Sequence, residues 1–390
     1  MTQRRAMKGV GWLGILLAVS GAAGAEPRVP TDNSLVVLRV ASSPEQERVR
    51  ALERAVESNP ADPTSLQTLL DAYLQLGRRT AEPRYFGRAE ALLASRLDGT
   101  HPPAGLALRM ADIWQYRHEY ENALVLIERV LATDPYDTQA LLMRAAIRQT
   151  QGRFDLAHAD CRTLLAHGEA ILGATCLAQT LSMTGSLTKA QRLLASLVER
   201  AHDMPASQRV WMLTALADME ERLGRAESAE ARLRQALEID RDAHYARLAL
   251  ADLLLDQERA AEVAALLSAM PQTEGALLRL AEATQRRAPL RRGDGQLQAR
   301  FAEASRRGER LHRRDLARLH LNVLGDPRAA LAWALENWNE QREPADARLL
   351  VRAALAVRDQ AALARLRQWR DQTGYEDRPL EQMLARSGPS

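Results

Sequence analysis

The chain has 390 residues, of which 46% are hydrophobic but only 4% aromatic, and its formal net charge is +3 at pH 7. Ala and Leu dominate while residues that favour strands are scarce, which argues against a strand-rich fold and for an almost purely helical one. Without residues 1–25 the chain has 50 basic and 50 acidic side chains, so its net charge gives no indication of nucleic-acid binding, which needs a clustered net excess of cations.

The first 25 residues have the pattern of a secretory signal peptide. A basic start at 4–8 precedes an apolar run at 10–19, which is too short to span a bilayer, and small residues up to Ala25 follow it. We expect cleavage after Ala25; a retained membrane anchor is the alternative. Arg far outnumbers Lys, which is typical of GC-rich bacterial genomes. These features predict a periplasmic or secreted protein with no integral membrane span after signal cleavage.

A Pro- and Ser-rich segment at 26–43 comes next, and we expect it to form an extended N-terminal arm. Beyond it the sequence repeats with a period near 34 residues. The clearest copy, at 104–137, has large, small and aromatic residues at fixed offsets: Met110, Ala111, Trp114, Tyr120, Ala123, Ile127, Val130 and Pro135. Later copies keep the small residues and a turn glycine: Ala145, Gly152, Ala157, Ala178, Gly185, Ala190, Ala217, Gly224, Ala229 and Ala236. Small residues must recur where two helices cross closely.

This spacing and these residue types resemble the tetratricopeptide repeat (TPR) family over most of residues 44–374. The resemblance implies an all-α fold, a right-handed α-solenoid of about eight TPR-like helical hairpins. An irregular helical bundle is the alternative. The expected organisation has five parts after the signal peptide. The arm at 26–43 is followed by a TPR solenoid at 44–272, with its best-matching repeats at 104–243. An irregular Arg-rich helical or loop insertion at 273–310, C-terminal TPR-like repeats and a cap at 311–374, and a tail at 375–390 complete the chain.

The resemblance also implies a partner-binding groove, because the first helix of each hairpin lines the concave side of such a solenoid. The side chains expected to face this groove are polar and partly acidic: Asp112, Gln115, Tyr116, Gln149, Gln179, Asp218, Glu221, Arg222, Asp252 and Asp256. A protein or peptide partner in the cell envelope is therefore expected.

The midpoint between the two cysteines falls at Gly168, in a predicted turn between two helices. Antiparallel helices bring such residues side by side, so an oxidising compartment favours a disulfide between Cys161 and Cys176. Two buried thiols are the alternative. A soft-metal site that includes His158 and His167 is a weaker one, because no closely spaced ligand pair supports it.

The segment 286–318 is the electrostatic outlier of the chain, with eleven arginines against four acids. Its candidate basic patch consists of Arg306, Arg307, Arg310, Arg313 and Arg314. Such a cluster attracts an anionic partner. A solvated Arg-rich helix is the plainer interpretation.

The sequence contains none of the motifs GxSxG, GxxxxGK[ST] or HExxH. We therefore expect no catalysis, no cofactor and no metal site. The predicted function is that of a periplasmic scaffold that binds a protein or peptide partner through its concave groove, in envelope assembly or in support of a membrane protein. The alternative is an accessory module for polymer handling in exopolysaccharide secretion.

Overall fold

The computed structural model describes residues 43–80, 82–94, 96–97, 103–167, 169–268, 270, 273–287, 295–306 and 313–386. The expected signal peptide and nearly all of the arm at 26–43 lie outside these residues, as do Arg307 and Arg310.

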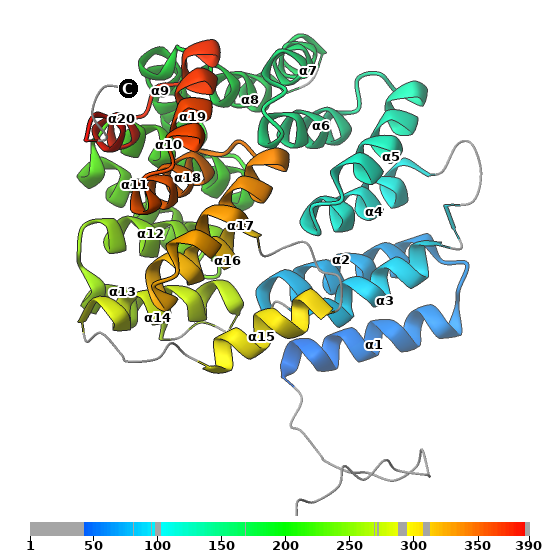
Figure 1. The fold of residues 1–390 in the computed structure, drawn as a ribbon. Helices are drawn as coiled ribbons and strands as arrows, with labels where there is room; N and C mark the ends of the chain where they lie inside the picture. Colours follow the sequence, from blue (N-terminus) through cyan, green and yellow to red (C-terminus); the bar gives the residue numbers. More distant parts are fainter. Residues whose placement is uncertain are drawn as a thin grey trace, which may run out of the picture.

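The described part of the chain consists of helices joined by short turns and contains no strand (Figure 1). The helices are α1 (Pro44–Ser58), α2 (Pro63–Thr80), α3 (Pro83–Ala94), α4 (Ala104–Tyr116), α5 (Tyr120–Thr133), α6 (Thr138–Thr150), α7 (Phe154–His167), α8 (Ala170–Ser182), α9 (Leu187–Glu199), α10 (Ala206–Arg222), α11 (Ala226–Ile239), α12 (His244–Asp256), α13 (Ala260–Leu267), α14 (Glu274–Arg287), α15 (Gly295–Arg306), α16 (Arg313–Leu319), a π-helical turn η1 (His320–Leu324), α17 (Pro327–Glu340), α18 (Pro344–Val357), α19 (Gln360–Thr373) and α20 (Arg378–Ala385). The predicted all-α fold is confirmed.

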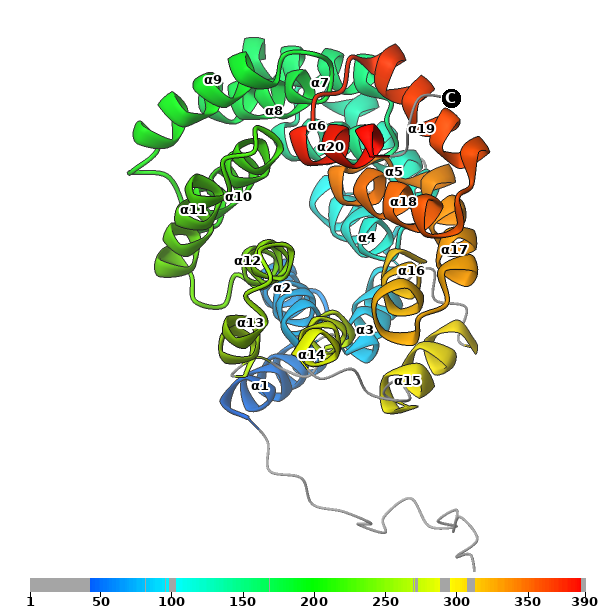
Figure 2. The ribbon, with the colours of Figure 1, turned by 60° about the vertical axis from the view of Figure 1, so that its left-hand side comes forward.

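Consecutive helices pack as hairpins from α2–α3 to α18–α19, and each hairpin packs on the next. This is the serial packing of a solenoid, as predicted. The segment 273–310 contains the hairpin α14–α15, and the segment 375–390 contains α20, which packs on α18. Figure 2 shows the series curving round, with first helices such as α8, α10 and α12 on the inside and their partners α9, α11 and α13 on the outside.

The turn within each hairpin has a fixed backbone conformation. Gly152, Gly185 and Gly224 have φ values of 74° to 75°, in the left-handed region that glycine enters without steric cost. At the same position of other hairpins, His118, Glu258 and Arg358 adopt φ values of 59° to 62°. The geometry of the hairpin therefore sets this conformation even where the sequence supplies no glycine.

The recurring small residues lie at the helix crossings. Their side chains are buried, with at most 1% of each exposed: Ala111, Ala123, Ala145, Ala157, Ala178, Ala190, Ala217, Ala229 and Ala236. Larger side chains such as Ile113, Ile127 and Ile147 fill the space beside them. The 34-residue pattern is thus the pattern of a continuous core.

The curved series of hairpins closes on itself and forms a ring. The segments 341–343 and 374–378, which connect the C-terminal helices, lie against the hairpin turns at Gly152, Gly185 and Gly224 (Figure 2). The backbone N–H of Arg342 donates to the carbonyl of Thr150 at 2.7 Å, although 192 positions separate the two residues in the sequence. The C-terminal hairpins therefore cover part of the middle hairpins.

Candidate partner-binding face

The inner face is the surface formed by the first helices of the hairpins, on the inside of the curve in Figure 2. The side chains that the sequence assigned to a groove come from α4, α6, α8, α10 and α12. Their surroundings differ along the series, so the expected residues fall into separate groups.

On α4 the expected residues are engaged within their own part of the solenoid. Asp112 forms an ion pair with Arg78 of α2. Tyr116 stacks on Phe86 of α3, with 4.3 Å between ring centroids. Gln115 is half-buried. This end of the inner face is held by contacts between neighbouring hairpins.

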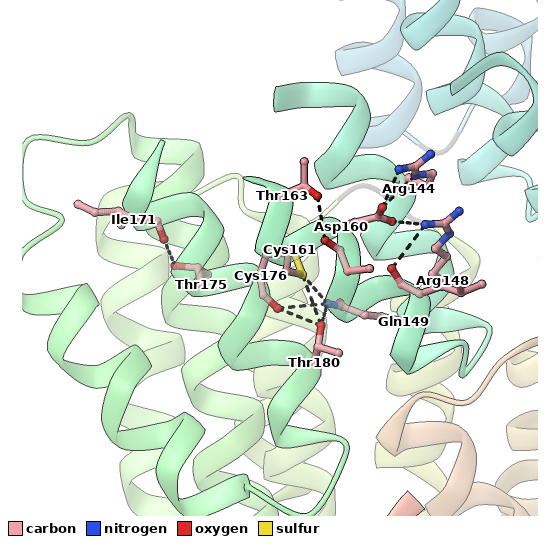
Figure 3. The surroundings of a disulfide bond; sticks show 12 residues. Arg144, Arg148, Gln149, Asp160, Cys161, Thr163, Ile171, Thr175, Cys176 and Thr180 are labelled. Atoms are coloured by element: carbon pink, nitrogen blue, oxygen red, sulfur yellow. Dashed lines mark hydrogen bonds and ion pairs between the residues drawn. A yellow bond between two sulfur atoms is a disulfide. The ribbon is translucent and has the colours of Figure 1, made fainter. Parts of the chain in front are cut away.

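On α6 and α8 the expected residues surround the disulfide (Figure 3). The structure joins Cys161 of α7 to Cys176 of α8, with 5.4 Å between their Cα atoms. The side-chain amide of Gln149 donates to Thr180 Oγ1 at 2.7 Å and to the carbonyl of Cys176 at 3.3 Å. Gln179 is half-buried beside them. Closing a loop of 15 residues stabilises the hairpin pair by about 3 kcal/mol in the chain-entropy model. Because both sulfurs are bonded to each other, neither thiolate is free to bind a metal.

On α10 and α12 the charged side chains form two layers, with guanidinium groups below and carboxylates above. Arg222 is 1% exposed, whereas the side chain of Asp218 is 41% exposed. The Nε of Arg222 donates to the carboxylate of Asp218 at 2.9 Å. Asp252 pairs with Arg279 of α14 at 2.6 Å and with Arg318 of α16 at 2.8 Å. The inner face therefore presents carboxylates to solvent and keeps its cations beneath them.

The two guanidinium partners of Asp252 fix its protonation. Burial acts to raise the pKa of Asp252, but the guanidinium groups of Arg279 and Arg318 outweigh it and lower that pKa to about 2. Asp252 is therefore charged at neutral pH. Asp256, one helical turn further along α12, is exposed.

Sequence reasoning missed Tyr245, at the start of α12. Its side chain is 72% exposed. Tyr245 lies before the polar positions of α12 at which the TPR repeat is expected to place groove-facing side chains. Only the folded structure therefore shows that it is exposed.

The C-terminal hairpins supply further residues that the sequence did not indicate. Arg348 of α18 forms an ion pair with Glu221 of α10 and a second with Asp377 at 2.9 Å. Burial raises the pKa of Glu221 to about 7, with Asp218 and Asp256 acting in the same direction and Arg348 against it. Glu221 is therefore covered by the C-terminal hairpins and is not part of the exposed carboxylate layer.

The described members of the Arg-rich patch are paired. Arg313 lies 2.6 Å from Glu340, and Arg314 holds Asp346 at 2.6 Å together with Glu343. Arg306 is exposed and lies 2.5 Å from Glu303. Arg313 thus joins the two helices of its own hairpin and Arg314 joins neighbouring hairpins, and their guanidinium groups are occupied by the protein's own carboxylates.

No protein-family model and no curated protein matches the chain. Among solved structures it is similar to the Cut9–Hcn1 hetero-tetramer of the APC/C, with a TM-score of 0.56 and 15% identity over 88% of this chain and 67% of that chain. It is also similar to a thermophilic TPR protein of Thermus thermophilus, with a TM-score of 0.37 and 26% identity over 52% of this chain and 99% of that chain.

A TPR protein from Parabacteroides merdae is similar over 79% of this chain and 92% of its own, with a TM-score of 0.36 and 13% identity. The similarity to Cut9–Hcn1 concerns the fold alone. It agrees with the hairpin series, the buried small residues and the constant turn conformation found in this structure. The chain thus has the fold of a tetratricopeptide repeat solenoid.

Proposed function

We propose that the protein is an exported scaffold that binds a protein or peptide segment on its inner face, in the assembly of the cell envelope or in support of a membrane protein. The observation that carries this proposal is the carboxylate layer on α10 and α12. The side chain of Asp218 is 41% exposed there and Asp256 is exposed, while Arg222, which pairs with Asp218, is buried.

A layer of exposed carboxylates favours a partner segment with basic side chains, because opposite charges steer and orient an incoming chain. The exposed ring of Tyr245 adds a flat surface beside these carboxylates for the apolar or cationic part of such a segment. The first helices of successive hairpins form one inner face, which suits an extended ligand.

Export rests on two features of the sequence and one of the structure. The signal-like start and the apolar run indicate secretion. The buried disulfide between Cys161 and Cys176 fits an oxidising compartment such as the periplasm. Among the described helices, none combines the length and the apolar character that crossing a membrane requires.

Crosslinking in intact bacterial cells tests the proposal. The tagged chain is crosslinked, purified under denaturing conditions, and the captured molecules are identified by mass spectrometry. We expect one envelope protein to be captured by the wild type and lost with Asp256→Lys, which reverses an exposed charge on the inner face without breaking a buried ion pair.

Glu238→Lys is the matched control, because Glu238 is an exposed carboxylate on the outer helix α11. It should leave capture unchanged. Equal loss with both variants would argue against the inner face, and capture of glycan alone would favour the polymer-handling alternative.

A further inference from the structure

The ring is held together by two kinds of contact. Neighbouring hairpins pack along the lengths of their helices and share a core. The closure contact joins the turns at Gly152, Gly185 and Gly224 to the segments 341–343 and 374–378, so that helix ends and turns meet there, and Phe154 and Met183 form its hydrophobic part. Because it joins hairpins that are distant in the chain, it can separate without unstacking consecutive hairpins.

Two of the hydrogen bonds in the closure contact involve backbone groups at helix ends. Arg342 N–H donates to the last carbonyl of α6, that of Thr150, whose hydroxyl in turn donates to Glu343 at 3.3 Å. At the other end, the carboxylate of Glu376 accepts from the N–H of Leu187 at 3.0 Å. Ser186, the residue before α9, makes no side-chain capping bond. Glu376 therefore acts as the missing N-cap of α9, supplied from a distant part of the chain.

The closed form covers part of the inner face. The guanidinium of Arg222 lies 5.5 Å from the ring centroid of Tyr375, and Arg348 holds Glu221. Both α10 residues belong to the surface that the solenoid presents to a ligand. A partner that used these side chains would have to replace the C-terminal hairpins, so binding there and closure exclude each other.

We propose that the closure contact opens as one unit and that its opening controls access of a partner to the inner face of α8 and α10. This inference rests on the proposed function of the inner face. Opening exposes Phe154 and Met183, which pack into the core of the C-terminal hairpins, and this hydrophobic cost makes the closed form the dominant one without a partner. A partner that binds the open form shifts the equilibrium towards it.

Amide hydrogen exchange of the full mature chain, resolved to single amides, tests the opening. In the wild type we expect the N–H groups of Leu187 and Arg342 to exchange with one shared opening free energy, lower than that of buried helical amides such as Leu216. The variant Glu376→Ala should speed exchange at Arg342 by about fivefold, the effect of losing a helix N-cap, although the Arg342 N–H donates to Thr150, at the opposite end of the contact.

Glu381→Ala is the matched control, because it removes an exposed carboxylate from α20 in the same segment. It should change neither amide. If Glu376→Ala affects Leu187 alone, or if both amides exchange only with global unfolding, the closure contact does not open as a unit. The wild-type measurement decides this even if the variant fails to fold. The exchange measurement is made without a partner. A ring that never opens would therefore contradict the proposed control of access, whereas the proposed function of the inner face would still be decided by the crosslinking experiment.

Discussion

Gly173 shows how a single residue fixes the approach of two helices. It lies on α8, where a Cβ atom would lie 2.5 Å from both the Cα and the backbone N of Leu165 on α7. Backbone atoms cannot move aside as a flexible side chain does. The absence of a side chain at this position therefore allows α7 and α8 to pack at the spacing that also aligns the two cysteines.

We predict that Gly173→Ala lowers the free energy of unfolding by about 1–3 kcal/mol, the usual cost of overpacking a core. Urea denaturation followed by circular dichroism measures it. Gly87→Ala on α3 is the control, since no atom lies within 4 Å of the added Cβ. There the greater helix propensity of Ala should stabilise the protein by up to about 1 kcal/mol. A destabilisation of similar size in both variants would mean that the contact with Leu165 is unimportant.

The hairpin is the element from which the molecule is built, and its internal turn has the same left-handed residue in most copies. Three hairpins fill that position with His118, Glu258 or Arg358 and bear the steric strain of a side chain there. Those hairpins form nonetheless, because packing against their neighbours holds them in place.

We expect Glu258→Gly, between α12 and α13, to raise the free energy of unfolding by about 1 kcal/mol, because glycine removes the strain of the left-handed conformation. A thermal melt shows this as a higher Tm. A change to glycine in the middle of a helix, Ala231→Gly on the exposed side of α11, should instead destabilise by about 1 kcal/mol. A fall in Tm with Glu258→Gly would indicate that the Glu258 side chain contributes more than its backbone strain costs.

At the scale of the whole molecule, Glu221 links the protonation of one side chain to closure of the ring. Its pKa is raised from 4.5 to about 7 by burial beneath the C-terminal hairpins. The titratable and charged groups around Glu221 come from four parts of the chain: Asp218 and Arg222 on α10, Asp256 on α12, Arg348 on α18, and Tyr375 with Asp377 before α20. The folded form holds the proton of the Glu221 carboxyl more tightly than the unfolded form does. The contribution of this proton to the free energy of unfolding is therefore fully present below pH 4.5 and is lost as the pH rises through 7.

When the pH is raised from about 6 to about 8, the free energy of unfolding of the wild type should therefore fall by about 1 kcal/mol more than that of Glu221→Gln, because the glutamine cannot ionise. Paired urea titrations at the two pH values measure this difference, and other titrating groups cancel because both proteins contain them. Glu238→Gln, on the outer surface, should track the wild type at both pH values. A pH-independent difference between wild type and Glu221→Gln would show that Glu221 is not buried by closure.

The sequence by itself determined the fold class and the repeating unit, because both follow from local patterns. Helix propensity, the 34-residue spacing and the small residues act within one hairpin and its neighbour, so a linear pattern carries them. The pairing of Cys161 with Cys176 is equally local, since the two residues lie 15 positions apart on consecutive helices. The polar character of the inner face was also predicted, from the register of the repeat.

Only the tertiary structure decided which inner-face residues are exposed and which are covered. Small rotations between successive hairpins add up along the series, and their sum brings Glu376 to Leu187, 189 positions away, and Glu343 to Thr150, 193 positions away. No periodicity in the sequence encodes that sum. For this reason Asp256 and Tyr245 stay open to solvent while Glu221 and Arg222, in the same part of the inner face, are covered by the far end of the chain.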